Sequence, residues 1–179
     1  MKEVEQLTIN PADYAYEITK TGKRDKSVEN DRIHRQKQEG LYYVEYHPAG
    51  GDANVEHLLA ALDYAVTLDQ VEARIAPDQA LFFINLTADE ARKIAELTDD
   101  SAENDFRRSV SCVGSTVCQI GMQDSNGLLK DIFAHLEEKG VDTSKLPRLH
   151  ISGCPHSCGT HQIGEIGFHG AVKLVDKKP

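Results

Sequence analysis

The sequence lacks any hydrophobic run approaching the roughly 20 residues that a membrane-spanning helix needs. Its N-terminus carries charged residues where a secretory signal would place an apolar core, so we expect a cytoplasmic protein. Hydrophobic residues make up 40% of the chain and charged residues 27%, which is typical of a soluble globular domain. With 179 residues, the chain is long enough for one domain and a small second unit.

The sequence also lacks the basic stripe by which proteins displace counterions from nucleic acid. It has 20 basic and 29 acidic residues, a net charge of −9. The acidic excess lies in residues 41–105, with 3 basic and 14 acidic residues, whereas residues 106–179 have 9 and 7. These counts disfavour nucleic acid as a partner. Internal repeats and low-complexity segments are absent as well.

Hydrophobic periodicity predicts five elements between residues 41 and 98. In chain order they are a strand over 41–46, a helix over 54–69, strands over 71–75 and 81–86, and a helix that follows the capping box at Thr87. The order β-α-β-β-α is typical of an α+β layer in which helices pack on one face of a mainly antiparallel sheet.

A polar and acidic segment, residues 99–105, marks the clearest boundary in the chain. Before the first predicted strand the sequence is polar, and we expect residues 1–32 to be a loosely packed lead-in. After the boundary, an apolar stripe over 128–136 predicts a helix that ends at Gly140, and two strands are expected near Leu149–Ile151 and over 163–168.

All four cysteines lie after residue 111, in two pairs: Cys112 and Cys118 with five residues between them, and Cys154 and Cys158 with three. Both pairs sit among small, turn-forming residues, whose backbone can wrap closely around an inorganic group. A reducing cytosol disfavours disulfides, and structural zinc sites usually pair cysteines across two-residue gaps. A 4Fe–4S cube is wider than one ion, and four thiolates suit its four irons. We favour the cluster, while zinc and buried structural thiols remain open alternatives.

The segment around the second pair, SGCPHSCG at residues 152–159, resembles the second cluster motif of the sirohaem-dependent nitrite and sulfite reductases. The spacing of Cys112 and Cys118 matches their first motif. Residues 35–41 and 72–79 resemble the start of, and a hairpin within, the ferredoxin-like repeat in the C-terminal half of those enzymes. The resemblance covers about residues 33–170. The sequence departs from the plant-type pattern at Asp124-Ser125-Asn126, where those members have Glu-Thr-Lys.

The resemblance implies an α+β fold: a ferredoxin-like half-repeat followed by an α/β cluster-binding segment of the nitrite/sulfite reductase type. On that basis residues 33–104 form the repeat, and residues 105–179 form the domain that binds the 4Fe–4S cluster and sirohaem. Family members continue well past the fourth cysteine, so we expect this domain to be truncated at its C-terminus. We also expect the chain alone to be an inactive part of an enzyme.

The resemblance further implies a function: the six-electron reduction of nitrite to ammonia or of sulfite to sulfide. Cys112, Cys118, Cys154 and Cys158 would hold the cluster, and Cys158 would also bridge to the sirohaem iron. Arg74 and Gln79 are expected to face the sirohaem carboxylates; no catalytic residue is assigned. The implied partners are an electron donor, such as ferredoxin or a reductase subunit, and the N-terminal half that this chain lacks.

Two other classes of function stay open. One is a non-catalytic iron–sulfur module for electron transfer or scaffolding, which would keep the four cysteines but lack sirohaem. The other is a zinc-stabilised interaction domain.

Overall fold

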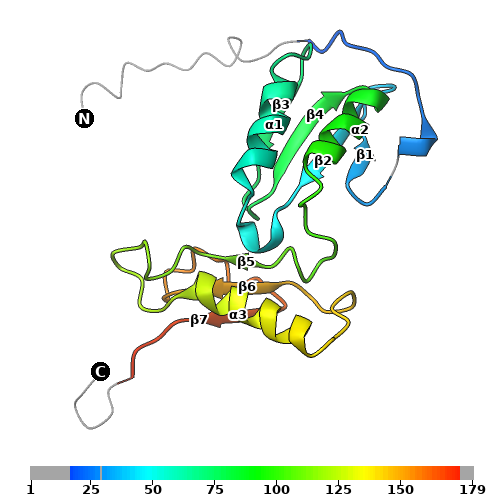
Figure 1. The fold of residues 1–179 in the computed structure, drawn as a ribbon. Helices are drawn as coiled ribbons and strands as arrows, with labels where there is room; N and C mark the ends of the chain where they lie inside the picture. Colours follow the sequence, from blue (N-terminus) through cyan, green and yellow to red (C-terminus); the bar gives the residue numbers. More distant parts are fainter. Residues whose placement is uncertain (1–16, 29, 174–179) are drawn as a thin grey trace, which may run out of the picture.

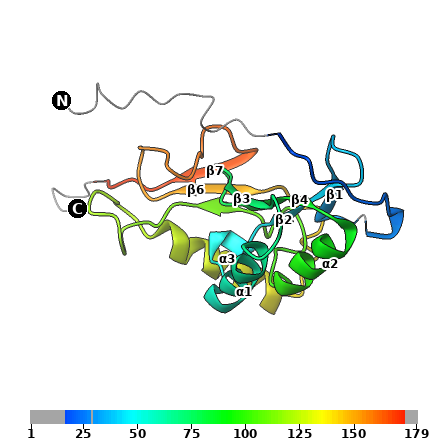
Figure 2. The ribbon, with the colours of Figure 1, turned by 90° about the horizontal axis from the view of Figure 1, so that it is seen from above.

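Two β-sheets of different kinds make up the fold (Figure 1). The computed structural model describes residues 17–28 and 30–173. The first sheet is antiparallel, with strand order β1-β2-β4-β3, and the second is parallel, with order β5-β6-β7. Figure 2 shows the three α-helices on the same side of the two sheets. The predicted α+β class is confirmed.

The antiparallel layer holds the elements predicted between residues 41 and 98. They are β2 (Tyr42–Tyr46), α1 (Val55–Ala65), β3 (Glu72–Ile75), β4 (Leu81–Leu86) and α2 (Ala88–Leu97). Strand β4 lies antiparallel between β2 and β3, which therefore run in the same direction, as in a ferredoxin-like split β-α-β unit. Strand β1 (Ile33–Arg35) adds to the outer edge of β2. It was not predicted, because three residues are too few to display a period.

The core of this layer lies between the sheet and the two helices. Strand β2 alternates as its pattern predicts, with Tyr42, Val44 and Tyr46 buried, and they pack with Phe83 of β4 and Ile94 of α2. Burial of such side chains is the main stabilising contribution to the layer.

Helix α1 ends four residues before the position expected from its apolar stripe. The Thr67 and Leu68 amides donate to carbonyls three residues back, and the Thr67 hydroxyl also donates to the Tyr64 carbonyl. The last turn is therefore tighter than an α-helix, and Gln70, at φ 52°, turns the chain toward β3. The spacing of apolar residues does not reveal where the α-helix gives way to this tighter turn.

Residues 17–28, part of the expected polar lead-in, are mostly exposed or half-buried and contact the antiparallel layer at a few points. Val28 is 2% exposed and belongs to the core of the antiparallel layer. The Lys20 ammonium lies 2.7 Å from Glu90 of α2, and the Tyr42 hydroxyl donates to the Asp25 carbonyl at 2.8 Å. Polar contacts thus attach this segment to the layer, and the boundary expected at residue 32 stays a prediction. Residues 1–16 lie outside the described part of the chain.

The parallel layer contains β5 (Val110–Ser111), α3 (Ser125–Glu138), β6 (Leu149–Ser152) and β7 (Ile166–His169). The helix predicted over 128–136 is confirmed and begins earlier, at the Asp124 cap. Strand β7 starts later than expected from the apolar Ile163, because the chain is still turning there after Thr160, at φ 53°. Within the described residues no helix has the length and apolar character needed to cross a bilayer.

The two layers meet along the turn that follows β2. The Gly50 amide donates to the Arg107 carbonyl at 3.1 Å, and a Cβ at Gly50 would lie 3.1 Å from the side chain of Leu129. Arg148 pairs with both Asp78 and Asp105, at 3.3 and 2.8 Å. The β3–β4 hairpin is thereby brought close to the end of β5.

Candidate metal centre

The two cysteine loops leave the parallel sheet at the same edge. Cys112 directly follows β5, and Cys154 comes two residues after β6. These strands are parallel neighbours, and the Cys112 amide continues their pairing by donating to the Ile151 carbonyl at 3.0 Å. The carboxyl edge of a parallel sheet is where ligands of α/β proteins usually bind. The fold therefore brings the starts of the two loops together.

Backbone hydrogen bonds join the loops at Gly153. Its carbonyl accepts from the amides of Met122 and Gln123 at 3.1 and 2.9 Å, so the end of the first loop returns to the start of the second. A Cβ at Gly153 would lie 2.5 Å from the Gln123 carbonyl oxygen, which leaves room only for glycine. Gly114 has φ 68°, and a Cβ at this position would lie 2.7 Å from the Ser125 backbone nitrogen, so glycine is favoured here too.

The Cys112 thiol is held by hydrogen bonds from both loops. The Gly153 amide donates to its Sγ at 3.1 Å, and the Ser125 hydroxyl lies 3.0 Å from the same atom. Burial acts to raise the pKa of Cys112, but the hydrogen bonds with Ser125 and with backbone amides, including those of Gly153 and Gly114, together outweigh it, and the pKa falls below its ordinary value. A thiol that ionises readily is suited to bind a metal.

The other three cysteines are less tightly held. Cys154 is buried, with its Sγ 3.3 Å from Nδ1 of His156, whereas Cys118 is half-buried and Cys158 is exposed. All four are free thiols. Among the described residues, no cysteine Sγ lies in a group of three potential ligand atoms within 4.8 Å of one another. The structure thus joins the two loops without gathering the sulfurs into the tight arrangement of a single-ion site.

Gln79 lies at the tip of the β3–β4 hairpin, at φ 69°, and reaches across to β5. Its Nε2 donates to the Ser111 carbonyl at 2.7 Å, and the Ser111 amide donates to its Oε1 at 3.4 Å. Since Ser111 directly precedes Cys112, Gln79 fixes the start of the first loop. Arg74 lies on β3 with its side chain 63% exposed, paired with Glu72 at 2.8 Å. The sirohaem contacts expected of Gln79 and Arg74 stay predictions.

Sequence reasoning missed Ser125 as part of the site. Its side chain is 2% exposed, and its hydroxyl also lies 2.8 Å from the Cys112 carbonyl oxygen. The signal in the sequence was weak: a serine at the start of a predicted helix normally indicates a cap. Here Asp124 caps the helix and leaves the Ser125 hydroxyl to Cys112.

No family model matches the chain. It is 33% identical to a ferredoxin–nitrite reductase of Synechococcus elongatus over 149 residues, which cover 80% of this chain and 29% of the relative. It is 30% identical to a sulfite reductase (NADPH) hemoprotein beta-component of Bacillus licheniformis over 110 residues, 55% of this chain and 19% of the relative. The chain thus spans less than a third of these relatives.

Among solved structures, the fold is similar to that of the Mycobacterium tuberculosis NirA protein. The TM-score is 0.65 at 23% identity, over 82% of this chain and 29% of that one. This likeness extends over both sheets, so the combination of an antiparallel and a parallel layer is shared with a known fold.

Proposed function

Since the chain is homologous to ferredoxin–nitrite reductases and sulfite reductase hemoproteins over most of its length, we propose that it is part of a reductase that contains sirohaem and a 4Fe–4S cluster. Its reaction would be the six-electron reduction of nitrite to ammonia or of sulfite to sulfide. The observation that carries the proposal is the joining of the two cysteine loops through Gly153, with the Cys112 thiol hydrogen-bonded between them.

The donor set suits an iron–sulfur cluster. Four thiols are free, and thiolates are the ligands that iron–sulfur clusters take. Cys112, Cys118, Cys154 and Cys158 would hold the cluster. The hydrogen bond from the Gly153 amide would stabilise the Cys112 thiolate, and the Ser125 hydroxyl, between the sulfur and the carbonyl of Cys112, would orient that ligand. When bound, the cluster and sirohaem supply electron transfer and a metal at which the substrate anion is reduced.

Three residues of the chain would have further roles in binding sirohaem or in holding the cysteine loops. Cys158 is the most exposed of the four thiols, which supports its proposed second role as a bridge to the sirohaem iron. The Arg74 guanidinium is exposed and could exchange Glu72 for a carboxylate of the cofactor. Gln79 would act by holding Ser111, and thus Cys112, in place. We also assign the protein to the cytoplasm, where its thiols stay reduced.

The partners proposed for the chain are an electron donor, such as ferredoxin or a reductase subunit, and protein equivalent to the N-terminal half of the relatives. The second is motivated by coverage, since the matched region is 29% of the nitrite reductase. Substrate cations and part of the sirohaem pocket would come from that half. Its addition to this chain should be required for turnover.

The test is anaerobic reconstitution of the chain with iron, sulfide and sirohaem in the presence of the N-terminal half of a relative such as the Synechococcus elongatus nitrite reductase, followed by absorption spectroscopy and analysis of bound iron and sulfide. We expect about four cluster irons per chain and one sirohaem iron, about five in all, together with a sirohaem band. Cys158→Ser should lose spectroscopic coupling between the two centres more completely than Cys112→Ser does. Equal loss in the two variants, or intact coupling in Cys158→Ser, would contradict the role given to Cys158.

The same measurement separates the alternatives. A brown protein with iron and sulfide but no sirohaem band would favour a non-catalytic iron–sulfur module. That alternative is supported by the small share of each relative that the chain covers. A colourless protein with bound zinc would favour a zinc-stabilised domain and count against both iron–sulfur functions.

A further inference from the structure

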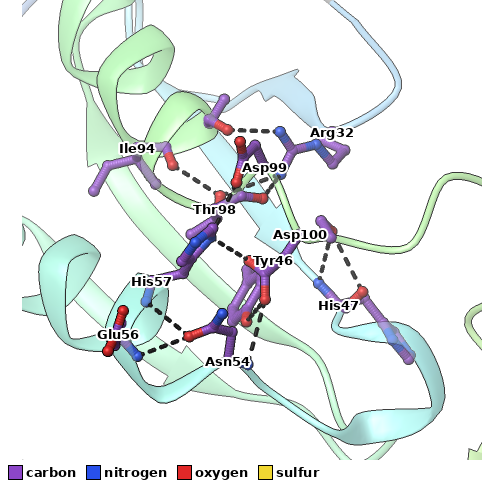
Figure 3. Close-up of polar contacts among 12 residues, drawn as sticks. Arg32, Tyr46, His47, Asn54, Glu56, His57, Ile94, Thr98, Asp99 and Asp100 are labelled. Carbon is purple, nitrogen blue, oxygen red and sulfur yellow. Dashed lines mark hydrogen bonds and ion pairs between the residues drawn. The ribbon is translucent and has the colours of Figure 1, made fainter.

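A second group of ligand-type side chains lies in the antiparallel layer, on elements other than the cysteine loops (Figure 3). His57 belongs to the first turn of α1, and Asp99 and Asp100 directly follow the cap of α2. The His57 Nδ1 atom lies 2.9 Å from Oδ1 of Asp99 and 3.2 Å from Oδ1 of Asp100. Three potential ligand atoms from two helix ends thus meet at one point.

The surrounding residues fix the Asp100 carboxylate. Its Oδ2 accepts a hydrogen bond from the Tyr46 hydroxyl at 2.8 Å and one from the Asn54 amide at 3.3 Å. Tyr46 is 1% exposed, and Asn54 caps the helix that carries His57. The Asp100 Oδ1 atom is consequently held toward the ring of His57. Carboxylates that ligate metals are typically oriented by such hydrogen bonds on the other oxygen.

The close atoms lie at ion-pair distance from one another but not in hydrogen-bond geometry. Within the described residues, His57 Nδ1 and Asp100 Oδ1 are inaccessible to water, and neither makes a hydrogen bond with suitable angles. Buried polar atoms without a partner are uncommon, and each needs a physical explanation. A cation between them would satisfy both, because metal ligands direct their lone pairs at a common point rather than at one another.

The separations agree with a small divalent ion. Nitrogen and oxygen ligands bind Zn²⁺ at roughly 2.0–2.2 Å, which in a tetrahedral arrangement places them about 3.3 Å apart. The distances from His57 Nδ1 to the two carboxylates, 2.9 and 3.2 Å, are close to that value. The Asp99 side chain is 71% exposed, so the group is open to solvent on one side, where water could complete the coordination.

The charge balance favours a cation at this place. Asp99 and Asp100 follow the C-terminus of α2, the negative end of its dipole. The nearby Arg32 guanidinium donates instead to the carbonyls of Ala95 and Thr98, at 2.7 and 2.6 Å. The two carboxylates carry two negative charges, and the Arg32 guanidinium supplies one positive charge nearby.

We propose that His57, Asp99 and Asp100 form a zinc site, with water as the fourth ligand. Bound zinc would tie the start of α1 to the end of α2. The site shares no residue with the cysteine loops, so it is independent of the proposed reductase function.

The test must remove competition from the cysteines, which also bind zinc. We would use the full chain with Cys112, Cys118, Cys154 and Cys158 changed to serine, and titrate it with ZnCl₂ at pH 7.5 by calorimetry. One zinc per chain is expected. His57→Ala and Asp100→Asn should each weaken binding at least tenfold, and Tyr46→Phe, which frees the carboxylate, about tenfold. His135→Ala, an exposed histidine on α3, is the matched control and should leave the affinity unchanged.

A fold check by circular dichroism accompanies each variant. If the four-serine chain is unfolded, the histidine ring signals of the unmodified chain are followed by NMR during zinc addition, with the His57 signal assigned from His57→Ala. A zinc-dependent shift of that signal supports the site. Absence of the shift, or calorimetric affinity unchanged by His57→Ala, would overturn the proposal and leave a protonated histidine paired with two carboxylates.

Discussion

Replacement of Gln79 by alanine should destabilise the chain through the junction between the two layers. The change removes the donor to the Ser111 carbonyl at 2.7 Å and the acceptor for the Ser111 amide at 3.4 Å. Ser111 is 1% exposed, so water cannot easily replace either bond. Leaving a buried polar group without a partner costs about 1–3 kcal/mol, and because the second bond is long we expect a total of about 2–3 kcal/mol.

A glycine variant separates these hydrogen bonds from the backbone conformation. Gln79 has φ 69°, a left-handed conformation that alanine also finds unfavourable by about 1–2 kcal/mol and that glycine adopts freely. Glycine, however, loses more backbone entropy on folding, by roughly 0.5–1 kcal/mol. Gln79→Gly should therefore be about 0.5–1 kcal/mol less destabilised than Gln79→Ala.

The assay is urea unfolding of the metal-free chain, with the exposed Gln38→Ala as control. The control should stay within about 0.5 kcal/mol of the unmodified chain, as surface substitutions usually do. The reasoning is refuted if Gln79→Ala also unfolds within about 0.5 kcal/mol of the unmodified chain at an unchanged slope.

Three further outcomes are expected. Ser125→Ala should raise the pKa of the Cys112 thiol toward its ordinary value, so mass spectrometry should find slower alkylation of Cys112 at neutral pH; unchanged alkylation would contradict this. Burial lowers the pKa of His47 below its ordinary value of 6.5. The free energy of unfolding should therefore be highest above pH 6.5 and decrease as the pH falls below 6.5, because the unfolded chain takes up a proton there more readily than the folded chain does. The free energy of unfolding of His47→Gln should lack this decrease. Arg32→Ala should cost about 2–3 kcal/mol in thermal unfolding because the last carbonyls of α2 lose a charged donor, whereas an unchanged melting temperature would show that water replaces it.

The spacing of apolar residues predicted most of the fold, because residues that repeat with the period of a helix or strand lie on the face that packs in the core. Each predicted helix and strand was found, although α1 ends earlier and α3 begins earlier than expected. The strands that were missed, β1 and β5, have three and two residues and depend on pairing with longer neighbours. Segment 17–28 contacts the antiparallel layer through polar pairs, such as that between Lys20 and Glu90, which apolar periodicity does not reveal.

The sequence predicted that the two cysteine loops lie together, but it did not predict the residues that hold them in place. The paired spacing of the cysteines, together with Gly153, is visible in the sequence, and the structure joins the two loops at that glycine. The contacts of Ser125 and Gln79 arise from packing between segments far apart in the chain. Gln79 is 32 residues from Ser111, its hydrogen-bond partner, and no local pattern encodes that contact.

The order of the two sheets along the chain has a consequence for biosynthesis. The antiparallel layer is complete at Leu97, before Cys112 is translated, and two of its strand pairs, β1–β2 and β3–β4, join strands that are close in sequence. Domains commonly fold from the N-terminus while synthesis continues. The β3–β4 hairpin would then be formed when β5 leaves the ribosome, and Gln79 would hold Ser111, at the start of the first cysteine loop, before the second loop is made. Delivery of a metal would be the last event of maturation, onto a surface already half assembled.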